Sequence, residues 1–215
     1  VQIGALTSGL VEGLTTEQVS VLTSVQMGSL TATAVVGFET ADLAVLGSSQ
    51  LRGIRTQAVA VLVSEQVAAI GADAFTGLSS SHIAALRSDA VAGLSSDQIS
   101  RLSSSQVIGF ETVDFAGFSS SQLLGFGTSA IRGLQTAALR ALTTQAMTAL
   151  RSDQLRALTT MQIRVLTSET LSAISTSALS TLSSVQALSI TTIQFLGLSS
   201  EWLNAIAGAV VNRRS

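Results

Sequence analysis

Few residues of this chain could carry out chemistry. His82 is the sole histidine among 215 residues, and the sequence has no Cys or Tyr. One imidazole cannot build a multi-histidine metal site, and a chain without Cys has no thiolate nucleophile or Cys-based zinc site. The sequence is rich in hydroxyls, with 33 Ser and 23 Thr, but a catalytic Ser or Thr needs a base beside it. We therefore predict no catalytic, cofactor-binding or metal-ligating residue, and no enzyme.

The charged residues suggest self-association rather than nucleic-acid binding. All eleven basic residues are Arg, and the formal net charge is −2. Residues 1–126 carry ten acids and four Arg, whereas residues 127–215 carry three acids and seven Arg. This polarity suggests head-to-tail association that weakens as salt screens the charges. Four Arg are spaced by multiples of eight residues, and we predict that they form one stripe of assembly contacts. They are Arg132, Arg140, Arg156 and Arg164.

An eight-residue repeat organises the whole chain. A large apolar residue occurs at each of 26 octad positions from Leu6 to Ile206, and we call these residues the first column. A second apolar column follows five residues later, from Val11 to Val211. Ser or Thr stands two residues after the first column in 23 of the 26 octads. The pattern predicts a single repeat domain over residues 1–215, with an irregular C-terminal cap at 205–215.

The eight-residue period excludes a continuous helix or strand. In one unbroken α-helix the first column would drift by about 80° per octad. In one unbroken strand the two columns would lie on opposite faces. The chain must therefore turn once per octad, and the gap of three from Val19 to Leu22 brings the two columns together on a helical face.

We predict an all-α solenoid with one very short helix per octad. The strict hydroxyl column fits helix N-caps, with acidic residues often directly after it. Small residues before the first column would let successive helices approach closely. A β-solenoid is the alternative, favoured by the Thr, Val and Ile content. The predicted N-caps are Thr16, Ser24, Ser64, Ser96 and Ser168.

Two single residues interrupt a column that mostly holds Gln or Ala. His82 is interpreted as a solvated substitute for Gln, with a general base or ligand as the alternative. Trp202 could be a contact anchor at an end of the repeat array or could close the terminal core. The seven Phe lie in the two core columns and are therefore assigned to core packing. The uncharged run 170–200 holds 14 Ser or Thr, which argues against a transmembrane segment.

The repeat resembles octapeptide tracts of large secreted bacterial surface proteins of the adhesin-like or haem-utilisation-like kind. The segments that carry the resemblance are Leu14–Val19, Leu142–Met147 and Leu158–Ile163. The resemblance implies an extracellular, repetitive structural element, and it brings no catalytic or haem-ligating residue. We expect a filament subunit or the stalk of a bacterial surface protein that self-associates end to end, with no cofactor.

A surface-binding module, such as an adhesin or an ice-binding face, is the alternative function. The Thr residues directly after the first column are expected to be freer than the strict hydroxyl column, because they are not the predicted caps. Charged residues interrupt this row of candidate surface hydroxyls. The row comprises Thr15, Thr23, Thr31, Thr143 and Thr159.

Overall fold

The computed structural model of the chain describes residues 5–211. Every regular element in that range is a short helix, and none is a strand, so the β-solenoid alternative is excluded. The chain divides into two compact units, Val1–Phe110 and Glu111–Ser215. Each unit is described by itself below. The predictions of one continuous repeat domain and of a C-terminal cap stay predictions.

In the N-terminal unit successive octads each supply one helix, and the helices whose bounds are described are α-helices with 3₁₀ helices among them. They are α1 (Ser8–Glu12), α2 (Thr16–Ser20), α3 (Ser24–Met27), α4 (Ala32–Val35), α5 (Thr40–Ala44), α6 (Ser48–Gly53), α7 (Thr56–Val59), α8 (Ser64–Ala69), η2 (Ala72–Gly77), α9 (Ser80–Ala85), α10 (Ser88–Ala92), α11 (Ser96–Ser100) and η3 (Val107–Gly109).

The C-terminal unit continues the same pattern and ends in a longer helix. Its helices are α12 (Thr112–Ala116), α13 (Ser120–Gly125), α14 (Thr128–Gly133), α15 (Thr136–Ala141), α16 (Thr144–Met147), α17 (Ser152–Ala157), α18 (Thr160–Arg164), α19 (Ser168–Ala173), α20 (Thr176–Leu179), α21 (Ser184–Leu188), α22 (Thr192–Leu196) and α23 (Ser200–Val211). The predicted all-α architecture of one very short helix per octad is thus confirmed.

The chain turns between helices through two extended residues. Leu86 at the end of α9 has φ −64° and ψ 137°, and the next residue, Arg87, has φ −71° and ψ 150° as the N-cap of α10. No residue of the range 5–211 has a positive φ. The turn therefore requires no glycine for its backbone, and it repeats with many side chains at the cap position.

The helix N-caps lie one residue earlier than predicted. Thr16 and Ser168 are the first residues of α2 and α19, and their N-caps are Thr15 and Thr167. The Thr15 hydroxyl accepts a hydrogen bond from the Gln18 N–H at 3.3 Å, while the Gln18 Oε1 accepts one from the Thr15 N–H at 2.9 Å. This reciprocal capping box joins the cap to the third helical residue and so fixes the cap position. The same correction applies to Ser24, Ser64 and Ser96, which follow the N-caps Thr23, Val63 and Ser95.

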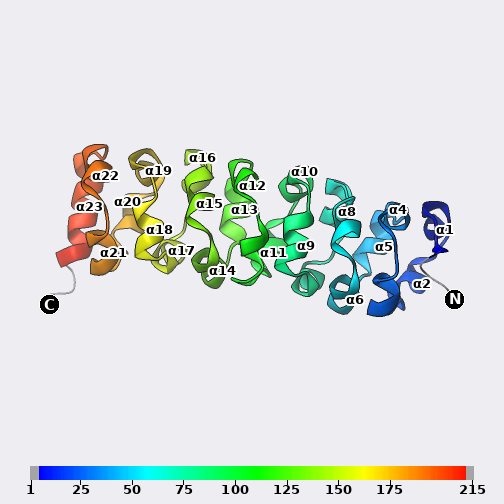
Figure 1. Cartoon of the computed structure of the whole chain (residues 1–215). Coiled ribbons are helices and arrows are strands. Elements are labelled where there is room, and N and C mark those ends of the chain that lie inside the picture. Colours follow the sequence, from blue (N-terminus) through cyan, green and yellow to red (C-terminus); the bar gives the residue numbers. More distant parts are fainter. Residues whose placement is uncertain (1–4, 212–215) are drawn as a thin grey trace. The chain divides into compact units, whose positions relative to one another are not determined.

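Helices three octads apart stack on one another. In the C-terminal unit α16 contacts α19, and α19 contacts α22, and these three form a row in Figure 1. Their first residues, Thr144, Ser168 and Thr192, are 24 positions apart. In the N-terminal unit α3 contacts α6 in the same way. Each unit is therefore a solenoid with three helices and 24 residues per turn.

Glycine permits close approach between turns. A Cβ on Gly53 would lie 2.1 Å from the carbonyl oxygen of Ser24, and a Cβ on Gly77 would lie 1.9 Å from that of Ser48. Small residues therefore do let helices approach, as predicted. The helices concerned are one turn apart, however, and not successive along the chain as predicted.

The two apolar columns form the core. The first column is buried at every octad from Leu30 to Ile206, and the second from Val11 to Ala187. Helices of four to six residues do not persist alone in water, so this burial between turns must hold them. The remaining members are half-buried or exposed: Leu6, Leu14 and Leu22 of the first column, and Phe195, Leu203 and Val211 of the second.

The last described helix departs from the octad length. Helix α23 has twelve residues and contacts α20 and α21. Residues 205–211 of the predicted irregular end form its last seven residues, and residues 212–215 lie outside the described residues. None of the described helices has both the length and the hydropathy of a membrane span.

Candidate functional site

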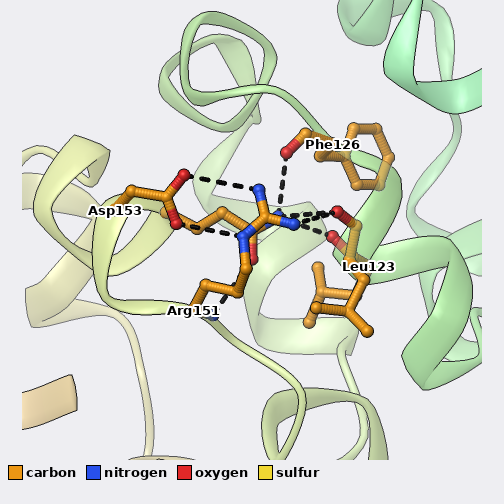
Figure 2. Close-up of polar contacts among 6 residues, drawn as sticks. Leu123, Phe126, Arg151 and Asp153 are labelled. Carbon is orange, nitrogen blue, oxygen red and sulfur yellow. Dashed lines mark hydrogen bonds and ion pairs between the residues drawn. The ribbon is translucent and has the colours of Figure 1, made fainter.

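Buried glutamines at the third helical position join one turn to the preceding turn. Gln154 of α17 is fully buried, and its Oε1 accepts from the Arg151 N–H at 3.1 Å. Its Nε2 donates to the carbonyl oxygens of Leu123 at 2.9 Å, Leu124 at 3.3 Å and Phe126 at 2.8 Å. Figure 2 shows dashed lines that end at the carbonyl oxygens of Leu123 and Phe126, which accept these hydrogen bonds. One side chain thus caps its own helix and binds the helix end of the turn before.

The same arrangement recurs in both units. The acceptors are carbonyl oxygens 28 to 31 residues earlier, where one helix ends and the next begins. No buried side-chain nitrogen or oxygen among the described residues lacks a hydrogen-bond partner. Further glutamines that donate between turns include Gln50, Gln66, Gln98, Gln106, Gln162, Gln186 and Gln194.

An exposed arginine adds a second link beside Gln154. The Arg151 Nη1 donates to the carbonyl oxygen of Leu124 at 2.8 Å, and its Nε lies 3.1 Å from Oδ1 of Asp153 (Figure 2). The hydrogen bond from Arg151 lowers the pKa of the Asp153 carboxyl. The pair remains largely solvated, so it contributes little to stability.

His82 takes the place of a glutamine in this row. Its Nδ1 lies 3.0 Å from the Ser79 backbone nitrogen, and its Nε2 lies 2.9 Å from the carbonyl oxygen of Ile54. Because the Ser79 N–H donates to Nδ1, we assign the ring proton to Nε2, which then donates to Ile54. The interpretation as a Gln substitute is therefore supported, but the side chain is buried, not solvated as predicted. The Ser79 hydroxyl also lies 3.1 Å from Nδ1, so both ring nitrogens are engaged in hydrogen bonds within the fold.

Trp202 also stands in the glutamine row. Its Nε1 donates to the carbonyl oxygen of Ile174 at 3.0 Å, 28 residues earlier, and the side chain is half-buried. This contact joins α23 to the preceding turn. The proposed role of Trp202 as an assembly contact stays a prediction.

The four arginines of the predicted stripe occupy two pairs of stacked helices. Arg132 and Arg156 lie on α14 and α17, whereas Arg140 and Arg164 lie on α15 and α18. Residues eight positions apart fall on neighbouring sides of a three-helix turn, which is why one stripe was the wrong expectation. Arg132 and Arg156 line a shallow depression with Asp153. Arg140 and Arg164 line another depression, whose other lining residues include Thr191, Ile193 and Gln194.

The row of threonines expected to be free consists of helix caps. Each of these hydroxyls accepts a hydrogen bond from a backbone N–H three residues later, at 3.1 to 3.3 Å. Hydroxyls committed to their own helix make a poor lattice for binding an ordered surface. The residues concerned are Thr15, Thr23, Thr31, Thr143 and Thr159.

The sequence pattern shows a column of mostly Gln or Ala at this position, but the pattern alone assigns it no role. A usable signal was present, since long polar residues alternate there with Ala directly before the buried second column. A polar residue at so buried a position must find partners. Within residues 5–211, no group of three or more His, Asp or Glu side chains is placed to hold a metal ion.

Comparison with known proteins identifies a repeat region. A family model described as the ALTTAQ repeat matches residues 35–72 and 67–104, both within the N-terminal unit. No significant match to the chain was found among curated proteins. The chain thus contains a region similar to the ALTTAQ repeat, which is consistent with a structural repeat protein.

Proposed function

We propose that the chain is a non-enzymatic structural element of an extracellular bacterial surface protein, either a stalk segment or a filament subunit. The observation that supports this best is the use of the long polar side chains. A side-chain nitrogen donates a hydrogen bond to a backbone carbonyl of the preceding turn in each of Gln154, His82 and Trp202. An enzyme needs unlike groups that converge on a concave site. In this chain the same hydrogen-bonded contact is repeated instead, and it holds each turn to the turn before.

Removal of one whole turn tests the structural role. Deleting residues 144–167 joins Thr143 to Ser168, which is the first residue of the helix stacked on α16. A structural element should keep its helical content and cooperative unfolding, and should still support attachment or fibre formation by the source cells. A deletion of residues 144–155 removes half a turn and serves as the control that breaks the stacking.

Two outcomes would contradict the proposed function. One is a whole-turn deletion that folds normally yet abolishes the biological activity as completely as loss of the entire chain, which would indicate a local site. The other is the absence of labelling when intact source cells are probed with an antibody against the chain while permeabilised cells are labelled.

A further inference from the structure

One side of the N-terminal unit carries acids without any base. The helices α2, α5 and α8 stack on one another there, and these helices and their N-caps contain no basic residue. We call their exposed side the acidic face. Its exposed carboxylates are those of Glu17, Glu39 and Glu65, and none of the three forms an ion pair with another residue of the range 5–211. The acidic face therefore presents three negative charges to the solvent.

One side of the C-terminal unit carries arginine and apolar residues without any acid. It is formed by α15, α18 and α21, which stack in the same way and contain, with their N-caps, no acidic residue. We call their exposed side the basic face. Arg140 and Arg164 form no ion pair with another described residue, and no acidic side chain lines the groove of about 540 Å³ beside them. Met161, Val185 and Leu188 are 62% to 72% exposed, although α21 contacts both α18 and α23.

On other sides of the units, opposite charges lie together. Arg101 at the end of α11 pairs with Asp73 of the stacked helix η2 at 3.2 Å. Arg132 and Arg156 share a depression with Asp153. The acidic face and the basic face instead keep unlike charges apart, in different units. Each of these two faces therefore has a potential that an oppositely charged partner would satisfy.

The two faces are also complementary along each helix. On the acidic face the carboxylates lie at the N-cap or at the second helical residue, and the fifth residues are small. On the basic face the second residues are apolar, and two of the three fifth residues are Arg. Two such helices that meet antiparallel place carboxylates beside guanidinium groups and apolar side chains beside small ones. The fifth residues are Ser20, Ala44 and Ala68 on the acidic face and Arg140, Arg164 and Leu188 on the basic face, and the second residues of the basic face are Ala137, Met161 and Val185.

We propose that the acidic face of one copy packs on the basic face of a second copy of this chain, with the helices of the two faces antiparallel. The occupant is a second copy because the chain itself offers the complementary charge and the same interval between helices. On both faces successive helices begin 24 residues apart, so a match at one helix recurs at the next. Each copy has one face of each kind, and such a heterologous contact can add further copies. The contact rests on the proposed structural function and specifies how copies meet in its filament form.

Charge reversal on the acidic face tests the contact. The acidic-face variant is Glu39→Arg with Glu65→Arg, on the adjacent helices α5 and α8. It should weaken self-association by about tenfold or more, measured by sedimentation velocity over a range of protein concentrations. The matched control is Glu12→Arg with Asp97→Arg, which changes the net charge equally at exposed residues of the same unit outside the acidic face, and it should associate like the wild type. Arg already occurs as an N-cap elsewhere, for example at Arg55, Arg87 and Arg151.

Exchange of the charges between the two faces separates this contact from the effect of net charge. Adding Arg140→Glu and Arg164→Glu to the acidic-face variant gives a swapped variant with the wild-type formal net charge of −2. Its two faces attract each other again, so its self-association should return to within about threefold of wild type. Adding Arg132→Glu and Arg156→Glu instead gives the same net charge but leaves both faces basic. This control should associate as weakly as the acidic-face variant does.

Far-UV circular dichroism should be unchanged in every variant, which would show that each remains folded. Where charge reversal impairs folding, Glu39→Gln with Glu65→Gln replaces it and should weaken association by about threefold or more. Equal association of the swapped variant and its control would overturn the contact, as would an acidic-face variant that associates like the wild type. A wild-type chain that is monomeric at every concentration would also overturn it. That last outcome leaves the stalk form of the proposed function intact, because the whole-turn deletion tests that function separately.

Discussion

The His82 imidazole bridges two turns of the N-terminal unit, with its Nε2 2.9 Å from the carbonyl oxygen of Ile54. The same ring caps its own helix, because Nδ1 accepts from the Ser79 N–H at 3.0 Å. These are the two hydrogen bonds that a glutamine amide makes elsewhere in the row. A residue that invites a catalytic interpretation in sequence thus serves as a structural connector.

We expect glutamine to replace His82 with little loss. His82→Gln restores an oxygen acceptor for Ser79 and a nitrogen donor for Ile54, so the free energy of unfolding should stay within about 1 kcal/mol of wild type. His82→Phe keeps an aromatic ring but removes both hydrogen bonds, and it should cost about 1–3 kcal/mol. Urea unfolding followed by far-UV circular dichroism measures both. A smaller loss in His82→Phe than in His82→Gln would show that the ring contributes by packing rather than by its hydrogen bonds.

Gln154 should be far more sensitive than a surface glutamine. Gln154→Glu replaces the Nε2 donor with an oxygen that faces the carbonyl groups of Leu123 and Phe126, in a fully buried position. We expect a loss of about 3 kcal/mol or more, because a buried acceptor is placed against acceptors. Gln145 is exposed, so Gln145→Glu should change stability by about 0.5 kcal/mol or less. Similar unfolding midpoints for both variants would argue against the inter-turn bonds as a source of stability.

The period and the core followed from the sequence, whereas the size of a turn did not. Apolar columns at fixed spacing must meet if they are to be buried, which is why every residue from Leu30 to Ile206 in the first column could be assigned to the core. The number of octads per turn depends on the angle between successive helices, which the two extended residues between them set. The octad sequence pattern does not reveal that angle. The partner of Gln98, the Ile70 carbonyl 28 residues earlier, could therefore not be named.

The cap position was misassigned for a related reason. Ser and Thr populate two adjacent positions, and the sequence alone favours the stricter column as the cap. At the true cap position other residues are tolerated, such as Val63 and Gly47, because the side chain at the third helical position can cap the N–H by itself. The stricter hydroxyl column instead begins each helix, where Ser24 and Ser48 meet the glycines of the next turn.

Close approach between turns should make Gly53 intolerant of a side chain. Gly53→Ala would place a Cβ 2.1 Å from the carbonyl oxygen of Ser24, so α3 and α6 must move apart at a cost of about 1–3 kcal/mol. Gly9 in α1 has open space around it, and Gly9→Ala should stabilise the chain by about 0.4–1 kcal/mol. Thermal unfolding of the two variants distinguishes these effects. A stabilised Gly53→Ala variant would contradict the tight contact.

The Asp153 carboxylate should add a small amount to the free energy of unfolding, and this contribution should be lost in acid. The hydrogen bond from Arg151 lowers the pKa of the folded carboxyl, so the ionised form favours the folded state at pH values above the pKa of the unfolded chain. This contribution is lost as the pH falls through the folded pKa. Because both side chains are about half exposed, Asp153→Asn should cost less than about 1 kcal/mol near neutral pH. Urea unfolding at several pH values should show the wild-type and variant curves converging in acid, and a gap that persists there would exclude this linkage.

The two arginine pairs should differ in their effect on association between copies. Arg140 and Arg164 line the same depression as Ile193, whereas Arg132 and Arg156 line one beside Asp153. We expect Arg140→Glu with Arg164→Glu to weaken association and to reduce its salt dependence, because residues 1–126 of a second copy carry ten acids and only four Arg. Arg132→Glu with Arg156→Glu changes the net charge equally and is the matched control. Reversal of all four arginines should then weaken association no more than the first pair does, with little loss of helical signal. Sedimentation at low and high salt measures these effects, and equal weakening by both pairs would show that net charge, rather than the position beside Ile193, governs assembly.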